Sequence, residues 1–262
     1  MTLVSIIVPC YNQGQFLNDA LNSVFNQSHS NWECIIVNDG SSDSTEEIAM
    51  VWIKKDARFK LTTTLNGGLA MARNNGIKHA NGAFVLPLDA DDRISDDYIQ
   101  IALKLMEKSD LVKLVYAKGY KFGVESGIWK LPTFSLLNLA RSNMIHCSAL
   151  FRRSDWERVG GYDTNMKYGL EDWEFWIAIL KDGGEVKFID RVCFYYRIRA
   201  NSMVRSINYE ERKYTEEYVA KKHISFFLKN YSLLLESNSQ ASAILSSRKR
   251  IAIRFIKLIF SR

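Results

Sequence analysis

Short apolar runs alternate with segments of helical spacing through the first 120 residues of the chain. The runs fall at residues 3–8, 32–37, 59–63 and 83–88. Between them, apolar side chains recur every three or four positions and predict helices near 16–25, 48–53 and 69–80. Strands that are apolar on both faces and separated by helices are typical of a mostly parallel sheet covered on two sides. We therefore expect an α/β fold whose first half is of the nucleotide-binding type.

Beyond residue 120 the pattern becomes mixed. It predicts short strands around 111–117, 146–152, 186–189 and 192–198, a helix over about 171–182, and helical structure from about 208 onward. We expect one unit over residues 1–205, with halves 1–120 and 121–205. A C-terminal helical extension should cover residues 206–262.

Polar loops follow each of the first four predicted strands. In open α/β sheets, ligands bind beyond the carboxyl ends of the strands, so these loops are the first place to look for a site. The loops are Pro9-Cys10-Tyr11-Asn12, Asn38 to Asp43, Leu65-Asn66-Gly67-Gly68 and Asp89-Ala90-Asp91-Asp92. Four loops, two of them strongly acidic, should meet at one edge of the sheet.

The acidic loop after the fourth strand carries Asp89, Asp91 and Asp92 within four positions. Three carboxylates so close together repel one another unless a cation or hydrogen-bond donors neutralise them. Mg²⁺ or Mn²⁺, held by one or two carboxylates and substrate phosphates, would do so. The alternative is a solvated helix N-terminus, because acids favour the first turn of a helix beginning near Ser95.

Asp39 and the Gly67-Gly68 pair lie at neighbouring strand ends. A turn and a helix start explain most of the segment from Asn38 to Glu46 but do not require Asp39, whose carboxylate could accept hydrogen bonds from a base or a ribose. Backbone amides at Gly67-Gly68 could approach a diphosphate, with Arg73 one turn further on. Neither G-x-G-x-x-G nor a Walker A sequence is present, which argues against dinucleotide-binding and ATPase functions.

A second acidic pair, Glu171-Asp172, begins an aromatic helix. Such a pair at a helix N-terminus is stabilised by the helix dipole and needs no function. Asp172 followed by Trp173 and Trp176 also places a carboxylate beside flat apolar surfaces, which would suit a sugar ring and a hydroxyl to be deprotonated. The spacing of Phe175 and its neighbours favours core positions for both tryptophans, and desolvation near them should raise the pKa of Asp172.

Taken together, these motifs resemble the family-2 inverting glycosyltransferases of GT-A fold. The segments that carry the resemblance are Ser5 to Asn12, Val37 to Asp43, Asn66 to Asn74, Leu88 to Asp92, Gly161-Tyr162-Asp163 and Glu171-Asp172, within residues 3 to 200. The resemblance implies a GT-A catalytic domain over residues 1–205, with a nucleotide-sugar-binding half and an acceptor-binding half. It also implies transfer of a hexose or N-acetylhexosamine from a UDP-sugar to a glycan or lipid-linked saccharide, as in bacterial cell-surface polysaccharide synthesis.

The resemblance assigns roles to individual residues. Pro9, Tyr11, Asn12 and Asp39 would hold the nucleoside, Asn66, Gly68 and Arg73 would border the diphosphate, and Asp89 and Asp91 would contact the nucleotide-sugar. Asp91 and Asp92 would hold Mn²⁺ or Mg²⁺, Asp172 would be the catalytic base, and Glu171 and Trp173 would shape the acceptor pocket. The family's closing segment often carries a His, whereas this chain has Arg197 and Arg199 there, either against the diphosphate or in a solvated loop. His146 is expected to be a core or pocket histidine rather than a metal ligand.

Two other functions fit part of the pattern. A catalytically silent carbohydrate-binding or assembly subunit could keep the fold, although the acidic cluster and Asp172 argue against it. A nucleotidyltransferase would need a glycine- and lysine-rich loop after the first strand, where the chain has Pro9-Cys10-Tyr11-Asn12-Gln13-Gly14.

Charge is concentrated at the C-terminus. The chain has 262 residues with 35 Lys and Arg against 29 Asp and Glu, and residues 248–262 contain six basic and no acidic side chains, so the +6 belongs to that segment. A basic body that binds nucleic acid is not indicated. In helical projection the segment is amphipathic, and it could lie on an anionic membrane, on the protein itself or on a second copy.

The sequence shows no leader pattern and no apolar run of the roughly 18 residues needed to span a bilayer. We therefore expect a cytoplasmic protein, and the basic C-terminal segment could hold it on the inner face of the cell membrane. Four cysteines without C-x-x-C spacing are expected to be reduced thiols, three of them in the core.

Overall fold

A computed structural model describes residues 1–199 and 207–230 of the chain. In the first half the elements are β1 (Val4–Cys10), α1 (Gly14–Phe25), β2 (Trp32–Asn38), α2 (Thr45–Lys55), β3 (Phe59–Thr63), α3 (Leu69–Lys78), β4 (Phe84–Pro87), β5 (Arg93–Ile94) and α4 (Tyr98–Met106). In the second half they are β6 (Val112–Gly123), β7 (Gly127–Trp129), α5 (Leu136–Arg141), β8 (Leu150–Arg152), α6 (Arg153–Val159), α7 (Glu171–Leu180), β9 (Glu185–Ile198) and α9 (Tyr209–Lys222).

The nine strands form one sheet in the order β3-β2-β1-β4-β8-β6-β9-β5, with β7 paired to β6. β1, β2, β3 and β4 pair in parallel, and β6 pairs in parallel with β9. β8 runs antiparallel to both β4 and β6, while β5 and β7 run antiparallel to β9 and β6. Six strands therefore point one way and three point back, which agrees with the expected mostly parallel sheet.

Strand boundaries in the second half differ from the sequence prediction. The runs at 186–189 and 192–198 join into the single strand β9, whose pairing with β6 shifts register near Ala117. The run predicted at 146–152 is a strand only from Leu150, because His146 Nε2 bonds to the backbone of Ala117 and Cys147 turns toward Asp89. Apolar character alone did not separate the strand from the buried loop that precedes it.

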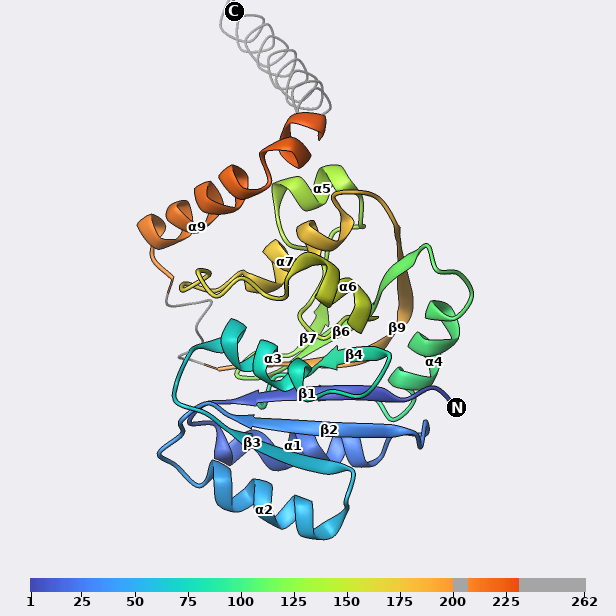
Figure 1. Cartoon of the computed structure of the whole chain (residues 1–262), viewed down its shortest axis with the longest axis vertical. Helices are drawn as coiled ribbons and strands as arrows, with labels where there is room; N and C mark the ends of the chain where they lie inside the picture. The colour runs from blue at the N-terminus through green and yellow to red at the C-terminus, as the bar shows by residue number, and fades with distance from the viewer. Residues whose placement is uncertain (200–206, 231–262) are drawn as a thin grey trace, which may run out of the picture.

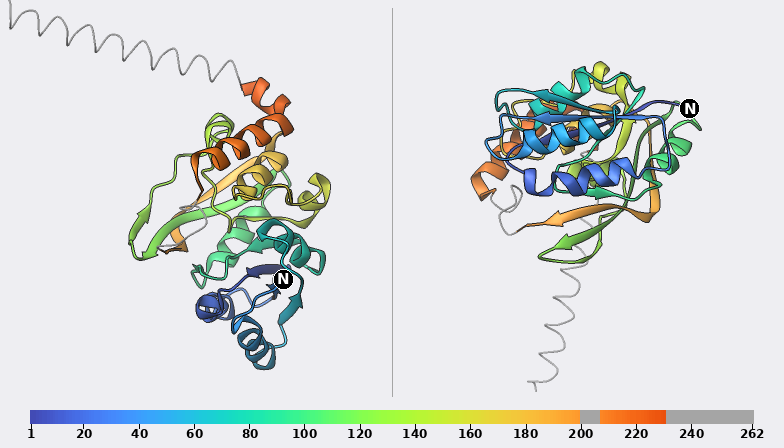
Figure 2. Two further views of the ribbon diagram at one scale, coloured as in Figure 1. Left: turned by 90° about the vertical axis from the view of Figure 1, so that its left-hand side faces the viewer. Right: turned by 90° about the horizontal axis from the view of Figure 1, so that it is seen from below.

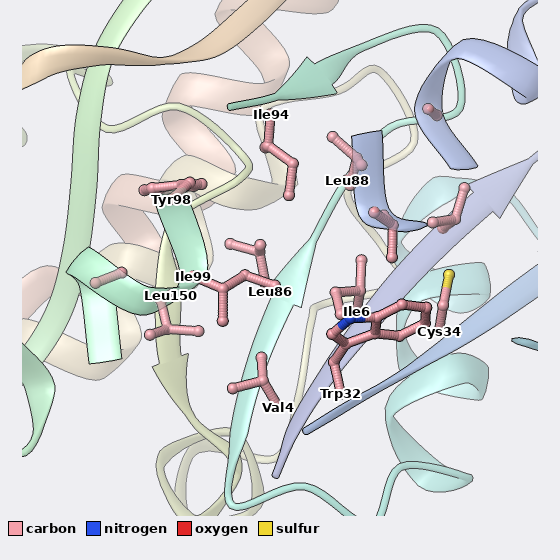
Figure 3. Packing of buried hydrophobic residues seen from close by; sticks show 14 of the residues in the cluster. Val4, Ile6, Trp32, Cys34, Leu86, Leu88, Ile94, Tyr98, Ile99 and Leu150 are labelled. Atoms are coloured by element: carbon pink, nitrogen blue, oxygen red, sulfur yellow. The ribbon is translucent and has the colours of Figure 1, made fainter. Parts of the chain in front are cut away.

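Helices cover both faces of the sheet, so alternate side chains of β1 enter different cores (Figure 1). Val4, Ile6 and Val8 pack with α1, α2 and α4, while Ile7 packs with α3 and α7. Figure 3 shows the first core, in which Ile6, Trp32 and Leu86 lie together near the strands. This two-sided burial is the reason why the strands read as continuous apolar runs.

The helix α9 packs on the second half of the protein rather than apart from it (Figures 1 and 2). Val219 and Phe226 belong to the same core as α3 and α7. Asn208 and Glu211 form a reciprocal capping box that fixes where α9 begins. The described part of the predicted extension is thus continuous with the main core, whereas the basic segment 248–262 lies outside the described residues.

Candidate active site

The carboxyl ends of β1 to β4 bring the four predicted loops to one edge of the sheet, at the left of Figure 1. Asn12 adopts a left-handed backbone conformation with φ of 52°, and its side chain accepts a hydrogen bond of 2.8 Å from the Ser42 amide. The Asn12 amide in turn donates to Ser41 Oγ at 3.0 Å. These bonds join the loops after β1 and β2. Pro9 is buried within β1, while the Tyr11 ring is half exposed beside the loops.

Asp39 organises the loop after β3. Its carboxylate accepts hydrogen bonds of 3.0 Å from both the Gly67 and the Gly68 amides, and Asn66 Nδ2 donates to the Asp39 carbonyl at 3.1 Å. Gly68, with φ of 83°, then begins α3. The structure therefore brings Asp39, Asn66 and Gly68 together as predicted, but the two glycine amides are bonded to Asp39, not directed at a diphosphate.

The acidic loop after β4 is buried, which excludes the solvated helix start. Asp92 is fully buried and Asp91 nearly so, and the next helix, α4, begins only at Tyr98. Burial, followed by repulsion from Asp89, raises the pKa of Asp91 to about 6. Burial and the two neighbouring carboxylates likewise raise the pKa of Asp92 well above its usual range. These shifts mean that the charge in the loop is incompletely compensated by the protein.

Two arginines of the closing segment lie against this acidic loop. The Arg199 guanidinium pairs with Asp91 Oδ2 at 2.8 Å, and the Arg197 amide donates to Asp92 Oδ1 at the same distance. Arg197 also donates from Nε to the Asp91 carbonyl at 2.8 Å and pairs with Asp19 at 2.6 Å. Both side chains are thus bound to the acidic loop and to α1 rather than solvated.

The ligand atoms of this acidic loop would fit a cation. Asp92 Oδ2 is buried and has no hydrogen-bond partner, and it lies with Asp89 and Cys147 in a group whose ligand atoms are all within 4.8 Å of one another. Burial raises the pKa of the Cys147 thiol, which leaves the two carboxyl groups as the oxygen ligands that Mg²⁺ or Mn²⁺ prefer. The structure therefore groups Asp92 with Asp89, which is also paired with Arg73, whereas Asp91 is paired with Arg199.

Arg73 lies behind the edge of the sheet and not at its surface. Its buried guanidinium donates to Asp89 Oδ1 at 2.7 Å and, from the other terminal nitrogen, to Glu171. The pair of carboxylates raises the pKa of Arg73 well above its usual value, despite the opposing effect of burial. The predicted contact between Arg73 and a diphosphate is replaced by a bridge between the two acidic sites, because this face of α3 points into the protein.

Asp172 is the partly exposed acid of the second site. Asn143 Nδ2 donates to its Oδ2 at 2.8 Å, and the Trp173 amide donates to its Oδ1 at 2.8 Å. Burial and the neighbouring Glu171 raise the pKa of Asp172 to about 7, with Arg73 and these hydrogen bonds acting in the opposite direction. The raised pKa expected from the sequence is therefore present.

The backbone before Asp172 is conformationally unusual. Gly169 and Leu170 both have positive φ, of 89° and 61°. A left-handed conformation costs a non-glycine residue about 1 kcal/mol or more, so the surrounding structure must hold Leu170 in place. The turn sets the direction in which α7 begins and hence the position of Glu171 and Asp172.

Both tryptophans of α7 belong to the core. Trp173 Nε1 donates to the Leu139 carbonyl at 2.7 Å and Trp176 Nε1 donates to the Ile145 carbonyl at 3.2 Å. Their burial removes Trp173 as an exposed surface for an acceptor sugar. His146 is also a core residue, since it stacks on Phe194 and burial lowers its pKa to about 3. Cys10, Cys34 and Cys193 are buried free thiols.

Sequence reasoning missed Asn143 and Cys147 as members of the site. Neither belongs to a motif, and the only available signal was their position before the predicted strand near 146–152. A cavity of about 690 Å³ lies elsewhere, between α1, β5 and β9, and it is lined by Asp19, Asn22, Arg93 and Arg191 among others. None of the predicted site residues lines it, so it is not the candidate active site.

Comparison with known proteins identifies the chain. The family model described as "Glycosyl transferase family 2" matches residues 5–167, which include all four loops at the sheet edge. The chain belongs to glycosyl transferase family 2. A second model, "N-terminal domain of galactosyltransferase", matches residues 137–202 of this family-2 glycosyltransferase.

Two relatives place the family-2 chain among bacterial glycosyltransferases. It is 32% identical over 217 residues to "Uncharacterized glycosyltransferase EpsJ" of Bacillus subtilis, covering 77% of this chain and 62% of the relative. It is 24% identical to the chondroitin synthase of Pasteurella multocida, over 81% of this chain but only 22% of that protein. The chain thus spans less than two thirds of the length of these relatives.

Solved structures share the fold of this family-2 glycosyltransferase. Residues 1–349 of TarS from S. aureus in complex with UDP-GlcNAc superpose with a TM-score of 0.67 at 20% identity, covering 88% of this chain and 73% of that one. The mannosyltransferase PcManGT of Pyrobaculum calidifontis, in complex with GDP-Man and Mn²⁺, gives 0.61 at 18% identity, covering 95% and 80%. The predicted GT-A-like α/β fold is therefore confirmed.

Proposed function

We propose that this family-2 glycosyltransferase moves a hexose or N-acetylhexosamine from a UDP-sugar to a hydroxyl of a glycan or lipid-linked saccharide, with inversion at the anomeric carbon. The observation that carries the proposal is the presence of two separate acidic centres, joined by Arg73, of which one has a carboxyl pKa of about 7. An in-line displacement needs one centre for the leaving diphosphate and another for the attacking hydroxyl.

Asp172 is the proposed general base. The acceptor oxygen forms a bond to the anomeric carbon while the bond from that carbon to the diphosphate oxygen breaks, and Asp172 takes the acceptor proton. A base works best when its pKa lies near the working pH, and a pKa of about 7 meets that condition. Asn143 and the Trp173 amide hold the carboxylate in one orientation, and the neighbouring Glu171 is the residue proposed to shape the acceptor pocket.

The loops at the sheet edge are the proposed nucleotide-sugar site. Tyr11 offers a half-exposed ring for the nucleobase, and Asn12 fixes the loop that carries Tyr11. Asp39 shapes the loop of Asn66 and Gly68. Pro9 lies in the buried strand β1 beneath them. Arg73 acts as a positioning residue, because it holds Asp89 on the donor side and Glu171 on the acceptor side.

Asp89, Asp91 and Asp92 are the proposed residues around Mn²⁺ or Mg²⁺. When bound, such an ion neutralises negative charge that grows on the departing diphosphate, a contribution of several kcal/mol in comparable enzymes. The Asp92 oxygen that lacks a partner and the raised pKa values of the loop support a cation there. The solved structure of PcManGT, which shares the fold, is a complex with GDP-Man and Mn²⁺.

Named relatives support the substrate class. TarS binds UDP-GlcNAc in its crystal structure, and chondroitin synthase is named for a polysaccharide product. No helix among residues 1–199 and 207–230 is long and apolar enough to cross a membrane. We propose that the basic segment 248–262 holds a cytoplasmic enzyme at the inner membrane face, close to a lipid-linked acceptor, or mediates self-association.

A panel of nucleotide sugars tests the proposal directly. UDP-glucose, UDP-galactose, UDP-GlcNAc, UDP-GalNAc and GDP-mannose would be incubated with Mn²⁺, and release of the nucleoside diphosphate would be followed with and without chelator. We expect UDP release from one UDP-sugar, and loss of that release on chelation. A nucleotidyltransferase would instead release pyrophosphate when it is given a nucleoside triphosphate and a sugar 1-phosphate, and absence of both kinds of release would indicate a binding subunit.

A further inference from the structure

Two tyrosine rings from different elements meet on the surface beside α7. Tyr168 lies in the loop before α7 and Tyr214 lies on α9, and their ring centroids are 5.9 Å apart with the rings at 88°. Tyr168 is 38% exposed and Tyr214 57% exposed. Single exposed aromatic residues are ordinary on protein surfaces, but a pair assembled from segments 46 positions apart needs an explanation.

Polar contacts beneath the pair fix α9 against this loop. Tyr218 Oη donates to Asp163 Oδ2 at 2.8 Å, and Lys222 Nζ donates to the same oxygen at 2.6 Å. Lys222 also pairs with the buried Glu174 of α7 at 2.9 Å, and His223 Nε2 bonds to that carboxylate at 2.6 Å. Since these contacts lie one and two turns beyond Tyr214 on the same helix, they determine where its ring stands relative to Tyr168.

The pair lies close to the proposed base. Tyr168 precedes Asp172 by four residues, so their Cα atoms are at most about 14 Å apart even if the chain between them were extended. The chain is in fact turned by the left-handed Gly169 and Leu170. Figure 1 also shows that α9 begins on the side of the molecule where β1 to β3 end. The tyrosines are thus within reach of a short saccharide whose end lies at Asp172.

The chemistry of the pair suits a sugar ring. A pyranose has an apolar C–H face and a polar edge, and tyrosine offers an apolar face with a hydroxyl at its tip. Two perpendicular rings form a corner that can contact both the apolar face and the polar edge of a pyranose. Polar groups lie one turn further along α9, where Asn165 Nδ2 donates to the Tyr218 hydroxyl at 3.4 Å and that hydroxyl donates to Asp163. Specific protein interfaces usually bury about 800 Å² on each partner, far more than two tyrosines provide.

We propose that Tyr168 and Tyr214 form a subsite for a pyranose ring of the acceptor, beyond the sugar whose hydroxyl is attacked. The inference rests on the proposed glycosyltransferase function and extends it, because it makes an oligosaccharide the preferred acceptor. Trp173, the aromatic residue next to the base, is buried and cannot serve this purpose. Helix α9 then contributes to the acceptor site and does not act merely as an appendage.

Binding measurements on the full chain test the subsite without requiring turnover. The parent protein and the variants Tyr168→Ala, Tyr214→Ala and Tyr214→Phe would be applied to a glycan array of mono- to hexasaccharides. Dissociation constants would then be determined by titration for the sugars that bind. Tyr209→Ala is the matched control, because Tyr209 is 75% exposed on the same helix but lies about 140° around it from Tyr214.

We expect the parent to bind an oligosaccharide at least tenfold more tightly than its terminal monosaccharide. Either alanine substitution should lower the affinity for the oligosaccharide about tenfold relative to that for the monosaccharide. Tyr214→Phe and Tyr209→Ala should leave this ratio unchanged. Equal affinity for mono- and oligosaccharides in the parent, or full affinity in both alanine variants, would overturn the subsite. Circular dichroism and melting temperature would show that the variants are folded.

Donor turnover separates this inference from the function on which it rests. UDP release from the donor in water, without acceptor, is measured for the parent, and the control Tyr209→Ala should leave it unchanged. If the parent releases no UDP under any condition but binds oligosaccharides through the two tyrosines, the transferase proposal fails and the subsite stands. If UDP is released and the sugar is transferred to monosaccharides and oligosaccharides equally well in all variants, the subsite fails and the transferase stands.

Discussion

Arg73 Nη2 lies 2.7 Å from Asp89 Oδ1, in an ion pair whose arginine is buried. The other terminal nitrogen of the same guanidinium donates to Glu171, the neighbour of the proposed base. A planar fork of donors is suited to holding two carboxylates at once, which a lysine ammonium cannot reproduce with the same geometry. The donor side and the acceptor side of the site are therefore positioned by one side chain.

Replacing Arg73 by lysine should weaken both stability and catalysis. A lysine can pair with Asp89 or with Glu171 but not with both in the present geometry, so one buried carboxylate loses its partner. Breaking a buried ion pair costs about 3–5 kcal/mol, and we expect the free energy of unfolding in urea to fall by about 3 kcal/mol. Arg212→Lys, in the exposed pair with Glu216 on α9, is the control and should change it by less than about 0.5 kcal/mol. Equal stability of the two variants would show that the bridge is not needed.

Asp172→Asn should abolish most of the transfer activity while donor binding persists. Loss of a general base lowers the rate by roughly 10²–10⁴-fold, and we expect kcat to fall in that range with an unchanged dissociation constant for UDP. In the parent, kcat/KM should rise tenfold per pH unit and level off near pH 7, because the pKa of Asp172 is raised to about 7 and only the carboxylate accepts a proton. Asp110→Asn, whose side chain is fully exposed, provides the comparison. Retention of transfer within a few-fold would exclude Asp172 as the base.

The same substitution should stabilise the fold at high pH. The folded pKa of Asp172 is above its unfolded value, so the folded state disfavours the carboxylate. The destabilisation is absent below about pH 4, grows between pH 4 and pH 7, and is fully present above pH 7. The melting temperature of Asp172→Asn should therefore exceed that of the parent at pH 8 by several degrees, at roughly 2–4 °C per kcal/mol. A difference that is the same at pH 4 and pH 8 would contradict the raised pKa.

Mn²⁺ should stabilise the protein through the acidic loop. A ligand present at one hundred times its dissociation constant adds about 2.7 kcal/mol to stability, which predicts an upward shift of the melting temperature that chelator reverses. Asp92→Asn and Asp89→Asn should each reduce this shift by at least half. Asp96→Asn, an exposed acid a few residues away, should keep it. An identical shift in all four proteins would place the ion elsewhere.

Deleting residues 241–262 should abolish binding to anionic vesicles. Residues 248–262 carry six basic side chains, and each lysine or arginine near an anionic membrane contributes about 1 kcal/mol. UDP release from the donor should be unaffected, since the proposed site lies within residues 9–199. Vesicles of phosphatidylglycerol and phosphatidylcholine would be sedimented with the parent and the truncated chain. Unchanged sedimentation would exclude the membrane role and leave self-association to be tested by light scattering.

The sequence by itself determined the strands of the first half, the order of the loops and the chemical character of the site. β1 to β4 are buried on both faces, and that burial is what makes them visible as apolar runs. The parallel arrangement then requires their carboxyl ends to lie at one edge, so Asn12, Asp39, Asn66 and Asp89 had to be neighbours. Local pattern and topology were sufficient for these features, and the family resemblance added the roles.

Tertiary structure alone decided where side chains point and what they are paired with. Arg73 and Glu171 are 98 positions apart, and nothing local to either residue indicates the other. Asn143 and Asp172 are 29 positions apart, yet the Asn143 side-chain amide donates to the Asp172 carboxylate. The Arg199 pair with Asp91 and the Tyr168 contact with Tyr214 likewise join distant segments. Such contacts depend on how whole elements pack, which periodicity along the chain does not encode.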